Sequence, residues 1–211
     1  MINPVSDTAR YIEPCCYSKQ LTQIMKRCEE RENGFPACAH FFSYSDWGAE
    51  ELIPFMATHV ELCELTVCLV HPDIQTLVAI DRLMKGKIII DAKAGESDHL
   101  VKKLLLICQP GTEEEADRQR AIVCNLFSHY MENGRAVYAE DNIGFRCIAA
   151  GNNHRHLFLQ GSINQQPCNG TQLFTLTTDR IAYEEAMEVL RSKARTKRLT
   201  VNQLKKIVER T

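Results

Sequence analysis

Several features that assign a sequence quickly to a functional class are missing from this chain. No Cys-x-x-Cys pair occurs, which removes the usual sequence support for a zinc site. No apolar run approaches the length of a transmembrane helix, and residues 1–14 lack the charged and apolar regions of a signal peptide. The net charge is only −2, so no global field favours a polyanion or a membrane surface. We therefore expect a soluble, cytoplasmic protein with no metal ion or other cofactor and no membrane partner.

Cysteine, by contrast, is plentiful, with ten residues in the chain. Several stand inside apolar runs such as LTVCLV and LLLICQ, where a free thiol behaves as a small hydrophobic side chain. Because the chain carries no secretion signal, reduced thiols are a better interpretation than a disulfide framework. Cys63 and Cys68 are five residues apart, which predicts that they lie on opposite faces of a regular strand.

The order of the expected elements indicates the fold class. Strands alternate with helices in the first part of the chain and follow one another in the later part, which predicts an α/β domain: a mixed β-sheet with helices on both faces. Capping boxes at Thr112–Glu115 and Thr200–Gln203 mark two helix starts. The expected helices are 18–32, 46–58, 72–85, 112–132, 179–193 and 200–210, and the expected strands are 37–43, a part of 60–70, 87–91, 101–108, 135–139, 145–150, 154–160 and 172–177.

The stretch 144–177 is the most informative, because it predicts three consecutive strands. Phe145–Ala150 and His154–Gln160 are apolar-rich and are joined by Gly151-Asn152-Asn153, so we expect an antiparallel hairpin. The sequence Gly161-Ser162-Ile163-Asn164 follows as a tight corner, and we call residues 161–164 the corner below. Gly161 permits a close approach of neighbouring backbone.

This pattern resembles the second half of the phospholipase D superfamily motif, in which a His-x-Lys strand and a turn with Asp precede a strand ending in Gly-Ser-x-Asn. Residues 161–164 match that ending. The positions of the family's His, Lys and Asp hold Cys147, Ala149 and His154, and the family's later Glu falls near Gln172.

The resemblance implies a phospholipase D-like domain over residues 36–193, preceded by an N-terminal extension and helix (1–35) and followed by a basic C-terminal helix (194–211). It also implies a single degenerate copy of the motif, since the His-x-Lys residues are absent and the chain has no internal repeat. Enzymes of the family build their site from two copies, so the resemblance implies a homodimer.

The candidate ligand-binding residues fall into three groups. Ser162, Asn164 and Gln172 belong to the corner and its surroundings, where the family orients its site and binds phosphate, although Ser and Asn also stabilise ordinary turns. His154 and His156 are two apart, so we expect them on one face of a strand. Ser45 and Trp47 follow the first strand, where ligands of open α/β sheets often bind and where a helix cap is the simpler alternative.

The segment 191–210 is strongly basic, with eight Lys and Arg residues against Glu209, so the remainder of the chain carries a charge of −9. Such an asymmetry makes nucleic acid a candidate partner. A solvated pair of helices whose cations lie near helix C-termini is the alternative. The stripe Val201, Leu204, Ile207 and Val208 must be buried against this domain or a second chain.

Three functional hypotheses follow. The first is a non-catalytic phospholipase D-like protein that binds a phosphate-containing ligand or nucleic acid, with no catalytic residue, because the motif strand offers no histidine for proton transfer. The second is a phosphodiesterase that uses His154, His156 or His40 in a rearranged site. The third is a structural protein-interaction module.

Overall fold

The structure is a computed structural model that describes residues 21–24, 26, 38–43, 48–60, 62–86, 101–161, 163 and 172–210. Its centre is an eight-stranded sheet in the order β1-β7-β6-β5-β2-β3-β4-β8. The strands β2, β3 and β4 are parallel neighbours and all other pairs are antiparallel. The strands are β1 (Cys38–Ser43), β2 (Cys63–Val70), β3 (Val101–Gln109), β4 (Ala136–Glu140), β5 (Cys147–Gly151), β6 (His156–Gly161), β7 (Gln172–Thr177) and β8 (Arg198–Leu199).

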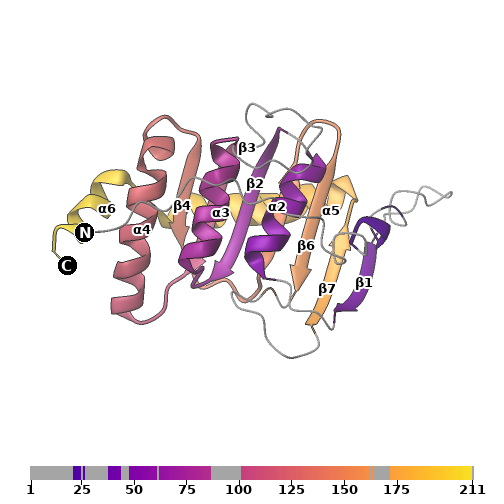
Figure 1. Ribbon diagram of the computed structural model, residues 1–211, viewed down its shortest axis with the longest axis horizontal. Helices are drawn as coiled ribbons and strands as arrows, with labels where there is room; N and C mark the ends of the chain where they lie inside the picture. The colour runs from indigo at the N-terminus through magenta and orange to yellow at the C-terminus, as the bar shows by residue number, and fades with distance from the viewer. Residues whose placement is uncertain are drawn as a thin grey trace, which may run out of the picture.

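Helices cover both faces of this sheet, as the order of elements predicts. The helices are α2 (Ala49–Val60), α3 (Ile74–Met84), α4 (Glu113–Glu132), α5 (Arg180–Lys197) and α6 (Val201–Val208). The first three lie side by side on the front face, and α5 crosses the back face from β7 towards β4 (Figure 1). Each face has its own apolar cluster, the larger under α2, α3 and α4 and the smaller under α5.

Helix starts agree closely with the sequence because capping side chains fix them. Both predicted capping boxes are present, Thr112 with Glu115 before α4 and Thr200 with Gln203 before α6. Asp73 and Asp179 cap α3 and α5 by accepting from backbone N–H groups three residues on. The helix α5 continues four residues beyond the predicted end at 193, and Ala194 in that extra turn is buried.

The hairpin is confirmed, but its turn differs from the prediction. β5 and β6 are adjacent and antiparallel, with Gly151 opposite His156. Asn152 closes the turn: its Oδ1 accepts from the N–H groups of His154 (2.8 Å) and Arg155 (2.9 Å). Gly151 therefore ends β5 and His154 belongs to the turn, which corrects the prediction that a strand begins at His154.

The C-terminal segment joins the sheet and the front helices. β8 pairs with β4 as an additional edge strand that the sequence did not indicate, because it has only two residues. The helix α6 packs on α4, where Leu204 is fully buried and Val201 nearly so. Of the predicted apolar stripe, Val201 and Leu204 are therefore buried within the same chain, whereas Val208 is exposed.

The remaining boundaries shift by a few residues at most, and some expectations fall outside the described residues. Of the expected helix 18–32, residues 21–24 and 26 are helical. The expected strand 87–91 and the residues 1–17 lie outside the described part of the chain. Cys63 and Cys68 belong to the front and back clusters respectively, which confirms their predicted opposite orientation.

Candidate functional site

One edge of the sheet carries the starts of three helices. The pairing directions place β1, β2, β3, β4 and β6 in one orientation, so their C-terminal ends lie along a common edge together with the first residues of β5 and β7. We call it the carboxyl edge; the arrows of β1, β2 and β6 point to it at the bottom of Figure 1. The helices α2, α3 and α4 each begin there. Open α/β sheets commonly bind ligands at this kind of edge.

The corner lies on this edge at the end of β6. A Cβ added to Gly161 would lie 2.3 Å from the backbone oxygen of Leu173 on β7, which confirms the predicted close approach of backbone. The Gly161 N–H donates to the Arg146 carbonyl at 3.3 Å. Ser162 and Asn164 lie outside the described residues, whereas Ile163 between them is buried in the front core.

Arg146 is a residue of this site that the sequence did not single out. Its guanidinium Nη1 donates to the Ile163 carbonyl at 3.0 Å, so the side chain reaches from the start of β5 to the corner. The side chain is half-buried. The sequence shows only a cation directly before the strand that carries Cys147. The contact between Arg146 and Ile163 depends on the pairing of β5 with β6, which the sequence around Arg146 does not reveal.

The two positions that correspond to the family's His and Lys are buried on the sheet. Cys147 and Ala149 are both fully inaccessible to solvent and lie in the cluster under α5. A hydrogen bond to the Cys68 side chain and burial together raise the pKa of the Cys147 thiol well above its usual value. At neutral pH Cys147 is therefore a thiol that packs as a small buried side chain.

His154 and His156 lie at the opposite end of β6 from the corner. His154 is exposed in the turn. The prediction that the two histidines share one face of a strand is therefore wrong. The His156 ring lies 4.8 Å from the Tyr183 ring, and burial, together with the charge of Arg180, lowers the pKa of His156. Because β6 separates them from Gly161, the structure does not bring these histidines and the corner together.

The first turn of α2 contributes carboxylates to the carboxyl edge. The Glu50 side chain folds back over Gly48, where an added Cβ would lie 2.4 Å from its Oε2. Burial is the main cause that raises the pKa of Glu50 and of Glu51. The buried Oε2 of Glu50 has no hydrogen-bond partner among the described residues. Ser45 and Trp47 lie outside the described residues.

Gln172, the first residue of β7, also lies on this edge. It pairs with Ser43 of β1 and is 1% exposed. Gly161 at the end of β6 pairs with Phe174, two residues after Gln172. Gln172 therefore lies near the corner, with its side chain in the interior.

The helix starts after β2 and β3 are already satisfied within the chain. Asp73 accepts from the Thr76 N–H at 2.7 Å, and Glu115 accepts from the N–H and hydroxyl of Thr112. Those two bonds are the largest causes that lower the pKa of Glu115, and the nearby His71 adds to them. His71 has a positive φ of 46° and its ring lies over Gly111. These two helix starts are therefore less suited to a further anion.

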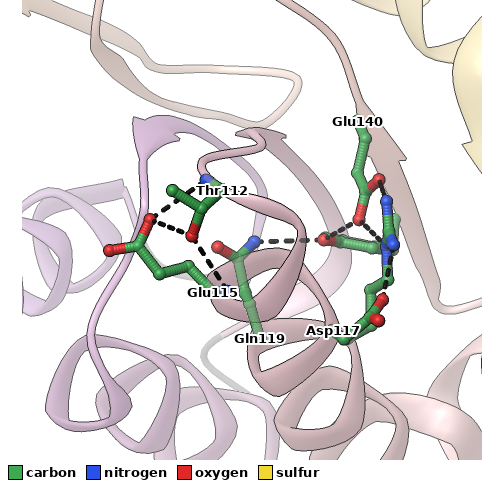
Figure 2. A network of polar contacts seen from close by, with 7 residues as sticks. Thr112, Glu115, Asp117, Gln119 and Glu140 are labelled. Carbon is green, nitrogen blue, oxygen red and sulfur yellow. Dashed lines mark hydrogen bonds and ion pairs between the residues drawn. The ribbon is translucent and has the colours of Figure 1, made fainter. Parts of the chain in front are cut away.

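The end of β4 carries a polar network, which Figure 2 shows from close by. Arg120 donates to both carboxylate oxygens of Glu140, at 2.8 and 2.6 Å, and to Asp117 at 2.7 Å. The Tyr138 hydroxyl donates to Glu140 at 2.8 Å and accepts from Gln119 at 3.0 Å. These bonds raise the pKa of Arg120, and burial raises that of Tyr138. Because the groups satisfy one another, we interpret the network as a structural brace between α4 and β4.

The basic segment 191–210 lies at the opposite side of the sheet from β1. Three of its cations form ion pairs: Arg191 with Glu64 at 3.1 Å, Lys193 with Asp141 at 3.1 Å and Lys205 with Glu132 at 3.3 Å. Five others are exposed and form no ion pair with any described residue: Arg195, Lys197, Arg198, Lys206 and Arg210.

Within the described ranges, no group of three or more His, Cys, Asp or Glu side chains is placed to hold a metal ion. Among the helices that the structure describes, none is both long and apolar enough to cross a membrane.

Comparison with known proteins supports the fold. No protein-family model and no curated protein matches the chain. Among solved structures, the crystal structure of phosphatidylserine synthase from Haemophilus influenzae Rd KW20 is similar with a TM-score of 0.53 at 12% identity, over 83% of this chain and 42% of that chain. TrmBL2, an archaeal chromatin protein that binds DNA, is similar with a TM-score of 0.41 at 11% identity, over 86% of this chain and 60% of that one.

The likeness to the synthase shows the fold alone. The chain has a phospholipase D-like α/β fold with a mixed sheet, and it spans less than half the length of the synthase chain. A TM-score of 0.41 supports no conclusion from TrmBL2.

Proposed function

We propose that the carboxyl edge around the corner binds a phosphate-containing ligand without turning it over. The observation that carries this proposal is Arg146, whose guanidinium reaches the backbone of the corner from the neighbouring strand. A guanidinium presents five donors in a planar fork that matches phosphate oxygens. The resemblance of residues 161–164 to the Gly-Ser-x-Asn ending supports the same place and adds Ser162 and Asn164 as proposed ligand contacts. The side chain of Gln172, which is 1% exposed, lies beneath this place and does not reach a ligand.

The absence of turnover follows from the groups at the motif positions. Nucleophilic and acid–base catalysis need a side chain that exchanges a proton near neutral pH. Cys147 is buried with a raised pKa, and Ala149 has no functional group. The competing phosphodiesterase would need His154, His156 or His40. The first two lie at the opposite edge, and His40 lies within β1 with its Nδ1 2.9 Å from the Thr175 hydroxyl.

The test uses bis(4-nitrophenyl) phosphate, a phosphodiester whose hydrolysis releases a coloured product. We expect the wild-type protein to bind it and to release no product. Arg146→Met should weaken binding roughly 10- to 100-fold, because a hydrogen bond to a charged group contributes about 1.5–3 kcal/mol. The matched control is Arg155→Met, since Arg155 likewise donates to a backbone carbonyl, that of His59 at 2.7 Å, but at the opposite edge.

Each outcome separates the hypotheses. Equal weakening by both substitutions would contradict the proposed place, and equal binding by all three proteins would contradict a role for Arg146. Product release that is lost in His154→Ala or His156→Ala would favour the phosphodiesterase. Ser45 and Trp47 are proposed as secondary contacts, and Ser45→Ala should have a smaller effect than Arg146→Met.

Nucleic acid is a second candidate ligand, favoured by the five exposed cations of segment 191–210 that form no ion pair with described residues. If all five contact phosphates of a single strand, log K should fall against log salt with a slope of about −3.5. The double variant Lys197→Gln/Arg198→Gln should make this slope shallower by roughly 1.4. Lys102→Gln/Lys103→Gln on β3 is the control. The third hypothesis, a protein-interaction module, would be favoured by two observations together. They are no binding of an oligothymidylate at low salt and a large apolar patch exposed on the surface.

We further propose a homodimer, on the resemblance alone. One chain supplies one corner, and an isologous interface would bring two corners together. Sedimentation at micromolar concentration tests this proposal: a single 24.0 kDa species would contradict it. If the dimer joins two corners, substitutions at Ser162 or Asn164 should weaken it, whereas substitutions in α6 should not.

A further inference from the structure

Cys68 and Cys147 lie directly opposite each other on neighbouring antiparallel strands, near the carboxyl edge. They are register partners of β2 and β5, and both side chains belong to the cluster under α5. Cys68 is 3% exposed and Cys147 is 0% exposed. The Cys68 Sγ donates to the Phe145 carbonyl at 3.5 Å, and the neighbouring Cys68 side chain contributes to raising the pKa of the Cys147 thiol.

Register partners on one face of an antiparallel pair lie within the range of Cα separations that a disulfide spans. Opposite residues of an antiparallel pair have Cα atoms about 4.5–5.5 Å apart, and a disulfide spans Cα separations of about 4.4–6.8 Å. Cys63 and Cys108 belong to the front cluster, so the sheet separates their side chains from this pair.

We propose that Cys68 and Cys147 form a reversible dithiol–disulfide site that is oxidised by a small, uncharged peroxide such as hydrogen peroxide. One sulfur attacks the peroxide O–O bond and becomes a sulfenic acid, and one water leaves. The second sulfur attacks the sulfenic sulfur, its proton joins the departing hydroxyl, and a second water leaves. Two thiols and one peroxide thus give one disulfide and two waters. A small dithiol reverses the reaction by thiol–disulfide exchange.

Burial determines which reagent reaches the pair and how fast it reacts. The thiolate is the reactive form, and two neighbouring thiols that are buried ionise rarely, so oxidation is slow. Bulky disulfides do not reach sulfur atoms that are 3% and 0% exposed. Cys38, by contrast, is exposed and serves as an internal standard for attack by peroxide. Once formed, the disulfide has the same protection from bulky reductants.

The cross-link ties the end of β2 to the start of β5, one residue from Arg146. It also closes a long loop between residues 68 and 147, which constrains the unfolded chain and favours the folded one. We therefore expect the oxidised protein to unfold at a higher urea concentration than the reduced protein.

Peptide mapping of the intact chain tests the proposal without any substitution. The protein is treated with hydrogen peroxide, remaining thiols are blocked with N-ethylmaleimide under denaturing conditions, and the product is digested with trypsin and a Glu-specific protease together. This digestion yields residues 65–82 and 147–155, each of which contains a single cysteine. We expect these two peptides to be linked, with a mass 2 Da below their sum, and to separate on treatment with dithiothreitol.

The controls decide between this pair and accidental oxidation. The Cys63→Ser variant should keep the link and the Cys68→Ser variant should lose it. If peptides 65–82 and 147–155 remain unlinked when exposure to hydrogen peroxide is extended well beyond the complete oxidation of Cys38, the proposal is wrong. It is equally wrong if the link forms only in urea, because the folded geometry would then not be its cause.

Discussion

Gly161 carries a steric constraint that is absent at the nearby Gly144. A Cβ at position 161 would collide with the Leu173 backbone, whereas a Cβ at 144 meets nothing within 4 Å. Because backbone atoms cannot rotate away, Gly161→Ala must push β6 from β7, at a cost of about 1–3 kcal/mol. Gly144→Ala should change stability by less than about 0.5 kcal/mol. Urea unfolding of both variants checks this, and equal stabilities would show that the strands separate freely at the corner.

Glu50 provides a pH-dependent prediction at the same scale. Its pKa in the folded protein is raised, mainly by burial, so folding favours the protonated form. The stabilising contribution is therefore present below the unfolded pKa of about 4.3 and is lost as pH rises through the folded pKa. We expect Glu50→Gln, which cannot ionise, to be more stable than wild type at pH 7.5. The difference should shrink towards pH 4 in urea unfolding, and a difference independent of pH would contradict this assignment.

Single residues also show where the sequence stops being informative. The need for glycine at 161 follows from the motif, and the buried state of Cys147 follows from its apolar surroundings. The position of His154 did not follow, because the Asn152 side chain closes the turn two residues further along than composition indicates. Arg146 was missed because its contact with Ile163 spans two strands and depends on their register.

At the scale of elements, α6 tests how the C-terminal segment is held. Leu204 is fully buried against α4, and Val208 is 36% exposed. Leu204→Ala should therefore destabilise the protein by about 2–4 kcal/mol through lost burial and the remaining cavity. Val208→Ala should have little effect. Thermal unfolding of both variants checks the prediction, and a large loss at Val208 would indicate that another chain covers this helix.

Elements were predictable where local chemistry fixes them. The capping boxes before α4 and α6 set the starts of these two helices within one residue of the prediction. β8 was not predictable, because two residues have no periodicity and gain their strand conformation only from β4. The extra turn of α5 likewise depends on the burial of Ala194 against the sheet.

At the scale of the whole molecule, the direction of the strands determines what can act together. The mixed sheet and the helices on both faces followed from the order of elements, and the likeness to phosphatidylserine synthase supports the same fold. Which edge each candidate residue occupies did not follow from that order. The strand β6 places the corner on the carboxyl edge and the two histidines on the opposite edge. Arg146 therefore lies beside the corner and not beside the histidines.

The central claim is that the carboxyl edge around Arg146 and the corner binds phosphate and does not catalyse its transfer. The most direct measurement is an amide NMR titration of the 15N-labelled protein with bis(4-nitrophenyl) phosphate, followed until binding saturates. We predict shifts concentrated at Arg146–Cys147 and Gly161–Asn164, with the ligand unchanged at the end. Shifts concentrated at residues 152–156, or a ligand that is hydrolysed during the titration, would contradict the account.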